Sequence, residues 1–156
     1  MCGIAGIMYK NDLGKSQVGK ALISMLDGCQ HRGPDSTGFA LYHGHKEDLL
    51  RLRFFVEDGP EGEKTLERIR AKLGEFQAEV VEEERIGSTG RFEVHFKGNL
   101  QKLSYALEHV AKVVSIGESL DIIKDIGGAH DVDDVYSVEN FQGSHGIGHV
   151  RLATES

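Results

Sequence analysis

The sequence contains no tryptophan, only two prolines and only two cysteines, Cys2 and Cys29. With so little proline and 20 glycines, tight turns have to be made by glycine, which reaches backbone conformations closed to other residues. The two cysteines do not have the spacing of metal ligands, so we expect no metal site in this chain. We also expect no disulfide between them, because a cytoplasmic compartment keeps thiols reduced.

Long apolar runs and blocks of positive charge are absent as well. No stretch approaches the ~18 consecutive apolar residues of a membrane-spanning helix, and the opening MCGIAGIMYK lacks the pattern of a signal peptide. The formal net charge is −7, whereas nucleic acids and anionic membranes attract basic faces. We therefore expect a cytoplasmic protein that binds a small molecule or another protein, and neither nucleic acid nor membrane.

The hydropathy pattern indicates an α+β protein. Its 156 residues, 39% of them hydrophobic, suffice for one domain or for two small lobes. Residues 2–9 predict a short buried strand, and the apolar spacing over 15–29 predicts an amphipathic helix with Cys29 on its buried stripe. Two further strands are predicted at residues 39–44 and 148–154.

The middle of the chain has the pattern of a self-contained unit. Its predicted elements are a strand at 49–57, a helix at 61–76, strands at 78–87 and 91–98, a helix at 99–113 and a short strand at 113–117. This β-α-β-β-α-β order is typical of a ferredoxin-like unit. The sequence therefore predicts a first domain segment at residues 1–47, an inserted unit at 48–120 and a return to the first domain at 121–156.

Cys2 is a candidate nucleophile because of its place in the chain. Once Met1 is removed, the free α-amine of Cys2 is neutral often enough to accept the proton of its own thiol. Gly3 beside it lets a substrate approach the backbone closely. The alternative interpretation is that Cys2 is an incidental small residue.

Two other stretches carry unusual polarity. HRGPDSTG, residues 31–38, offers the forked cation of Arg32, the unrestricted backbone of Gly33 and a carboxylate in a tight loop. GHVRLATES, residues 148–156, presents Arg151 and Thr154 at a strand end, where a guanidinium can bind a carboxylate bidentately while a hydroxyl assists. For both stretches the alternative is a purely structural arginine.

Taken together, MCGIAGI, HRGPDSTG and GHVRLATES resemble the class II glutamine amidotransferases, which are N-terminal-nucleophile (Ntn) hydrolases. The resemblance implies a four-layer α-β-β-α sandwich and release of ammonia from L-glutamine through a glutamyl thioester on Cys2. It also implies that Arg32 and Gly33 line the catalytic site around the nucleophile. Arg151 and Thr154 match the strand that binds the carboxylate end of glutamine.

Two features distinguish the branches of this family: the arginine strand, and the segment between the HRG loop and that strand. Asparagine synthetases carry a different arginine strand, while glucosamine-phosphate synthases and phosphoribosyl-pyrophosphate amidotransferases usually lack an insertion of this length. The insertion and the segment SIGESLDIIKDIG resemble the glutamate-synthase-related amidotransferase subunits. That resemblance implies no cofactor in this chain, and a synthase partner subunit that receives the ammonia and holds FMN and an iron–sulfur cluster.

The family's oxyanion-hole Asn-Gly pair and its acidic residue for the glutamine amine would follow Ser156. From the sequence we therefore expect a partial Ntn-hydrolase sandwich with an inserted ferredoxin-like β-α-β-β-α-β unit, inactive as it stands. A second polypeptide that completes the domain is one structural alternative. The other functional hypothesis is a non-catalytic module, in which the β-α-β-β-α-β unit binds an amino acid or docks a subunit.

Overall fold

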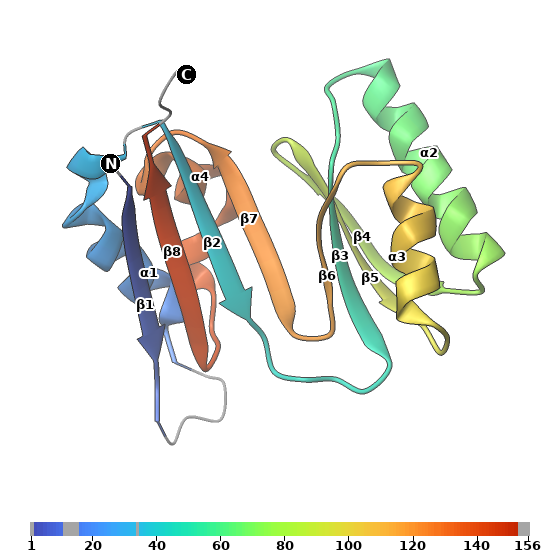
Figure 1. The fold of residues 1–156 in the computed structure, drawn as a ribbon, viewed down its shortest axis with the longest axis horizontal. Helices are drawn as coiled ribbons and strands as arrows, with labels where there is room; N and C mark the ends of the chain where they lie inside the picture. Colours follow the sequence, from blue (N-terminus) through green and yellow to red (C-terminus); the bar gives the residue numbers. More distant parts are fainter. Residues whose placement is uncertain (1, 11–15, 34, 153–156) are drawn as a thin grey trace. The chain divides into compact units, whose positions relative to one another are not determined.

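The computed structural model describes residues 2–10, 16–33 and 35–152. The chain divides into two compact units, which we call unit 1 (Met1–Gly44 with Ile122–Ser156) and unit 2 (His45–Asp121). The sequence places these boundaries after residues 47 and 120. In the described part of the chain, each unit consists of one four-stranded sheet and two α-helices (Figure 1).

Unit 1 is built on a sheet with the strand order β1-β8-β2-β7. Its strands are β1 (Gly3–Met8), β2 (Ser36–Tyr42), β7 (Leu120–Ile126), whose first two residues belong to unit 2, and β8 (His145–Arg151). Its helices are α1 (Val18–Asp27) and α4 (Ala129–Tyr136), with 3-10 turns at Gln30–Arg32 and Val138–Asn140. Figure 1 shows both helices on one face of this sheet. The sequence predicts β1, α1, β2 and β8, but no element at β7 or α4.

Glycines in β8 let α1 pack closely against the sheet. The α1 side chains Val18, Leu22 and Leu26 are fully buried. A Cβ atom at Gly148 would lie 2.7 Å from Leu26 Cδ1, and one at Gly146 would lie 2.9 Å from Leu22 Cδ1. Real Cβ atoms do not approach carbon so closely, so the two β8 residues beneath Leu22 and Leu26, Gly146 and Gly148, have to lack a side chain.

The prediction that Cys29 lies on the buried stripe of α1 is wrong. The helix ends at Asp27, and Cys29 follows in a tight turn in which its N–H donates to Leu26 O. Its thiol is half-buried beneath β1, where a Cβ at Gly3 would lie 2.8 Å from Cys29 Sγ. Cys2 and Cys29 are both free.

Unit 2 has the β-α-β-β-α-β order of elements that the sequence predicts. The elements are β3 (Leu49–Phe55), α2 (Pro60–Glu75), β4 (Glu79–Ile86), β5 (Thr89–His95), α3 (Leu100–Glu108) and β6 (Val113–Gly117). The strand order in the sheet is β4-β5-β3-β6, with antiparallel neighbours. Of the helices described in either unit, none is long and apolar enough to cross a membrane.

Alternation along β3 gives the unit 2 sheet one apolar face. Leu52 and Phe54 point into the core, together with Phe92 of β5. Helices α2 and α3 cover this face through buried side chains that include Ile69 and Leu103. Full burial of each such side chain stabilises the fold by about 1.5–3 kcal/mol, so this core is the main source of the unit's stability.

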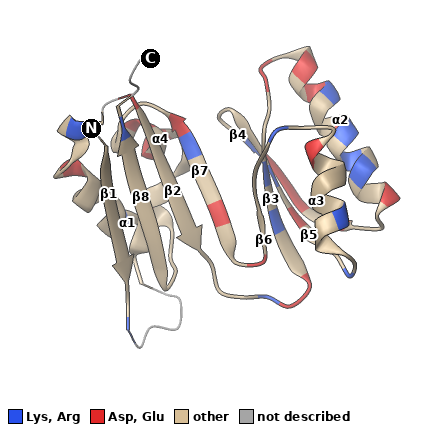
Figure 2. Cartoon of the chain, in the orientation of Figure 1, with Lys and Arg blue, Asp and Glu red and all other residues tan. Residues whose placement is uncertain are grey.

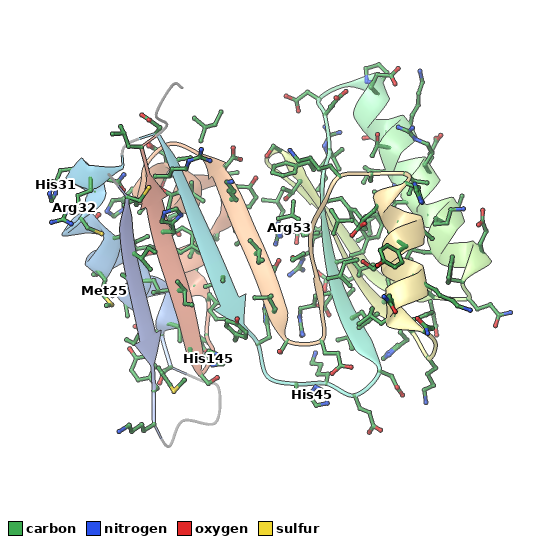
Figure 3. All side chains as sticks on the ribbon, in the orientation of Figure 1. Met25, His31, Arg32, His45, Arg53 and His145 are labelled. Carbon is green, nitrogen blue, oxygen red and sulfur yellow. The ribbon has the colours of Figure 1, made fainter. Side chains whose placement is uncertain are left out.

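Charged side chains alternate with these apolar ones along β3. Arg53 Nε and Nη2 donate to the two carboxylate oxygens of Asp121 at 2.8 and 2.7 Å, and Arg53 Nη1 donates to Thr89 Oγ1 at 2.9 Å. Arg53 and Asp121 are only 2% and 4% exposed. Arg51 Nε lies 3.2 Å from a carboxylate oxygen of Glu93 on the paired strand. Figure 2 marks these charges on the ribbon, and Figure 3 labels Arg53.

We predict that Arg53→Met lowers the free energy of unfolding by about 3–5 kcal/mol, because it leaves the Asp121 carboxylate buried without its partner. Urea unfolding followed by circular dichroism measures the loss. Arg53→Met combined with Asp121→Leu should recover most of it, since the whole ion pair is then replaced by apolar groups. As a control, Lys64→Ala removes the exposed ion pair with Glu61 and should cost less than about 1 kcal/mol. A loss for Arg53→Met no larger than this control would contradict the prediction.

Candidate functional site

The face of the unit 1 sheet opposite α1 and α4 exposes apolar side chains. Ile4 of β1 is 74% exposed and Ile126 of β7 is 83% exposed. A concave site of about 480 Å³ lies on this face. The polar or small residues that line it include Cys2, Ser36, Gly38, Lys124, His149 and Arg151.

The pairing of β8 with its two neighbours brings Cys2 and Arg151 together. Gly3 of β1 pairs with Val150 of β8, so Cys2, one residue earlier, lies at the level of Arg151. On the other side of β8, Ser36 of β2 pairs with Arg151. Because neighbouring strands lie about 4.8 Å apart, Cys2 and Ser36 flank Arg151 across three adjacent strands.

The HRG loop lies against the main chain of β8 at this position. Gly33 is buried, and a Cβ there would lie 2.5 Å from both Arg151 N and Val150 C. The Asp35 N–H donates to Arg151 O at 3.1 Å, and Gln30 Nε2 donates to Gly33 O at 2.9 Å. A side chain at position 33 would therefore push the loop away from the strand that carries Arg151.

The structure thus brings three of the five predicted site residues together: Cys2, Gly33 and Arg151. Arg32 is exposed at the end of the 3-10 turn, beside His31 in Figure 3, and is not among the residues that line the concave site. Thr154 lies outside the described residues, as does Met1. The roles predicted for Arg32 and Thr154 stay predictions.

Sequence reasoning missed Ser36, Lys124 and His149. A signal for His149 was present, because it lies two residues before Arg151 and side chains of a strand alternate between faces. Lys124 could have been found in the same way, because LDIIKDI forms β7 and its side chains alternate between the two faces of the sheet. These three residues add a hydroxyl, an ammonium and an imidazole to the predicted set.

The charge in the concave site is positive. Arg151 and Lys124 line it, whereas none of its lining residues carries a carboxylate. Within the described ranges, neither cation has an acidic side chain at ion-pair distance. The same ranges contain no cluster of three His, Cys, Asp or Glu side chains that could hold a metal ion. The arrangement is suited to a ligand with a carboxylate, held beside a thiol.

Two named proteins are similar to this chain over its whole length. One, from Methanothermobacter thermautotrophicus, is described as a "Putative glutamine amidotransferase"; it is 34% identical over 165 residues, which cover 100% of this chain and 53% of the relative. The other, from Rhizobium meliloti, is described as "Glutamine amidotransferase-like protein GlxB"; it is 32% identical over 159 residues, which cover 100% of this chain and 51% of the relative.

Both relatives carry names that refer to glutamine amidotransfer. The chain spans about half the length of the curated relatives that it matches. No protein-family model matches it. A solved structure of the chemotaxis kinase CheA P2 domain in complex with the response regulator CheY, from Thermotoga maritima, matches 53% of this chain and 99% of that chain, with a TM-score of 0.38 and 18% identity. A likeness this low carries no inference.

We predict that Gly33→Ala destabilises the protein by about 1–3 kcal/mol, because the added methyl group would collide with the main chain of β8. Thermal unfolding measures the effect. Gly44→Ala is the matched control, since a Cβ at Gly44 would meet nothing within 4 Å, and it should change stability by less than about 0.5 kcal/mol. Equal stability of the two variants would show that the loop does not rest against Arg151.

Proposed function

We propose that unit 1 carries the glutaminase site of a class II, Ntn-type glutamine amidotransferase, with Cys2 as its nucleophile. The observation that supports this most directly is the pairing register of β1, β8 and β2. It sets Cys2 at the level of Arg151 on the neighbouring strand, and both residues line the concave site. The two relatives named for glutamine amidotransfer support the same class of reaction.

The proposed reaction converts L-glutamine and water into L-glutamate and ammonia in two steps. In the first, Cys2 Sγ attacks the side-chain amide carbon of glutamine, while the α-amine freed by removal of Met1 takes the thiol proton. The carbon–nitrogen bond then breaks, and ammonia leaves with that proton, so that a γ-glutamyl thioester remains on Cys2. In the second step water attacks the thioester carbon, which releases glutamate and restores the thiol.

The other residues position the substrate in this proposal. Arg151 binds the α-carboxylate of glutamine through two parallel hydrogen bonds, which fixes the distance of the amide from Cys2. Gly33 keeps the HRG loop against β8 and thereby holds Arg151 in place. By the family resemblance, Arg32 completes the site around the nucleophile, and Thr154 assists Arg151.

The exposed apolar face of unit 1 fits one half of an α-β-β-α sandwich. Ile4, Met8 and Ile126 are each at least 70% exposed on strands β1 and β7 of the same sheet. We propose that a second sheet packs on this face in the complete enzyme, and that it provides the oxyanion donors. Each missing donor typically reduces the rate by about 10²–10³, so unit 1 without that sheet should hydrolyse glutamine very slowly.

We further propose a glutamate-synthase-type role, in which the ammonia passes to a synthase partner subunit in the cytoplasm. By the family resemblance, the iron–sulfur cluster and FMN of the proposed system would lie in the partner. Unit 2, with its β-α-β-β-α-β order and strand order β4-β5-β3-β6, is proposed to be a ferredoxin-like insertion in the amidotransferase domain.

We predict that Cys2→Ala lowers ammonia release from L-glutamine to the uncatalysed background, because it removes the nucleophile. The protein is expressed from its complete gene, mass spectrometry verifies the loss of Met1, and a coupled enzymatic assay measures ammonia. Cys29→Ala is the matched control, because it removes the other thiol and should retain activity. Equal ammonia release by the parent protein and Cys2→Ala would end the proposal.

We predict that Arg151→Lys raises the KM for glutamine by about tenfold or more, because an ammonium keeps the charge but loses one of two parallel hydrogen bonds. The change should fall mainly on KM, since the α-carboxylate is bound equally in the ground and transition states. Initial rates over a range of glutamine concentrations separate KM from kcat. An unchanged KM would exclude Arg151 from carboxylate binding.

A further inference from the structure

We propose that Lys124 and the hollow over Gly38 form a second anion-binding position of the concave site, which takes the side-chain carboxylate of L-glutamate. The site would then retain the product of the reaction in a non-productive orientation. The identity of the ligand rests on the proposed function, whereas the position itself rests on the geometry of β2, β7 and β8.

The hollow exists because β2 has small residues on the face of the sheet that carries the concave site. Gly38 pairs with His149 of β8, so an imidazole borders it on one side. On the other side, Lys124 Cγ and Cβ of β7 lie 3.8 and 3.9 Å from the point that a Gly38 Cβ would occupy. The next residue of β2 on this face is Ala40, which also lines the concave site. The floor is thus free of large side chains, between His149 and Lys124.

Lys124 and Arg151 stand on opposite sides of β2. Arg151 belongs to β8 and pairs with Ser36, while Lys124 lies beside Gly38, two residues further along β2. Since neighbouring strands are about 4.8 Å apart, the backbones of β8 and β7 are separated by about 10 Å. Because Arg151 and Lys124 both line the concave site from opposite sides of β2, a short ligand with an anionic group at each end fits between them.

The charge of the ligand follows from the charges of the site. Neither cation has a described acidic partner, and no lining residue is acidic, so one carboxylate would leave one cation uncompensated. L-Glutamine brings a single carboxylate and a neutral amide, whereas L-glutamate brings two carboxylates. Each additional charge-assisted hydrogen bond favours the dicarboxylate. Glutamate bound between Arg151 and Lys124 keeps its side chain over Gly38 and not at Cys2, and so it competes with the next glutamine.

Calorimetric titration tests this position in the Cys2→Ala protein, which cannot react and is expressed from its complete gene. The probes are L-glutamate, L-glutamine and glutarate. Lys124→Met should raise the Kd for L-glutamate and for glutarate by about tenfold or more, and the Kd for L-glutamine by less than about twofold. Lys124→Arg, which keeps the charge, should retain the affinity for glutamate. Lys20→Met is the matched control, because Lys20 is exposed on α1 and does not line the site.

A second variant tests the hollow without changing a charge. Gly38→Ala should fold normally, since its Cβ would meet Ile123 O at 3.5 Å and Lys124 Cγ at 3.8 Å, which are ordinary contacts. It should weaken glutamate binding by several-fold, because the methyl group occupies the floor of the hollow. Unchanged glutamate affinity in Gly38→Ala and Lys124→Met together would overturn the proposal.

The outcomes separate this proposal from the proposed function. If the parent protein hydrolyses glutamine but glutamate and glutarate bind equally well with and without Lys124, the anion position is wrong and the function stands. If glutamine is not hydrolysed yet glutarate binding depends on Lys124, the anion position stands and the function fails. Absence of any dicarboxylate binding, or equal losses in Lys124→Met and Lys20→Met, also overturns the anion position.

Discussion

The position of β8 between β1 and β2 is the constraint on which the candidate site depends. Three segments far apart in the sequence, beginning near residues 2, 36 and 145, meet only because β8 pairs antiparallel with both other strands. The register then determines which side chains become neighbours. A slip of one residue would turn Arg151 and His149 toward α1 and the glycines toward the concave site. The register is fixed because only Gly146 and Gly148 fit beneath α1, so helix packing and site geometry have the same origin.

Glycine serves two further purposes in unit 1, at positions where a side chain would collide or would fill a space. At Gly33 the missing side chain lets the HRG loop rest on the main chain of β8, which carries Arg151. At Gly38 it leaves the floor of the concave site open between Lys124 and His149. The composition indicates glycine only as a tendency to turns, whereas several glycines of unit 1 serve close packing around the site.

The sequence predicted the long, regular elements better than the short ones. The alternation of β3 and the apolar stripes of α2 and α3 are strong signals, and unit 2 has the predicted order of elements. In unit 1, β8 begins at His145 and not at Gly148, because glycine has a low strand propensity and conceals a strand that tertiary packing stabilises. Helix α4 is only 8 residues long and acidic, too short for a periodic pattern to stand out. The resemblance of MCGIAGI, HRGPDSTG and GHVRLATES to one family brought Cys2 and Arg151 into one hypothesis, whereas Lys124 became visible only once β7 was placed beside β2.

The central claim is that Cys2 forms a covalent bond with the γ-glutamyl group of glutamine. The most direct measurement is rapid acid quenching of the protein, expressed from its complete gene, during reaction with L-glutamine, followed by mass spectrometry of its N-terminal peptide. The account predicts a peptide that begins at Cys2 and carries one γ-glutamyl group, which disappears when glutamine is exhausted. Ammonia release with an unmodified Cys2 at every quench time, or with the glutamyl group on Cys29 instead, would contradict it.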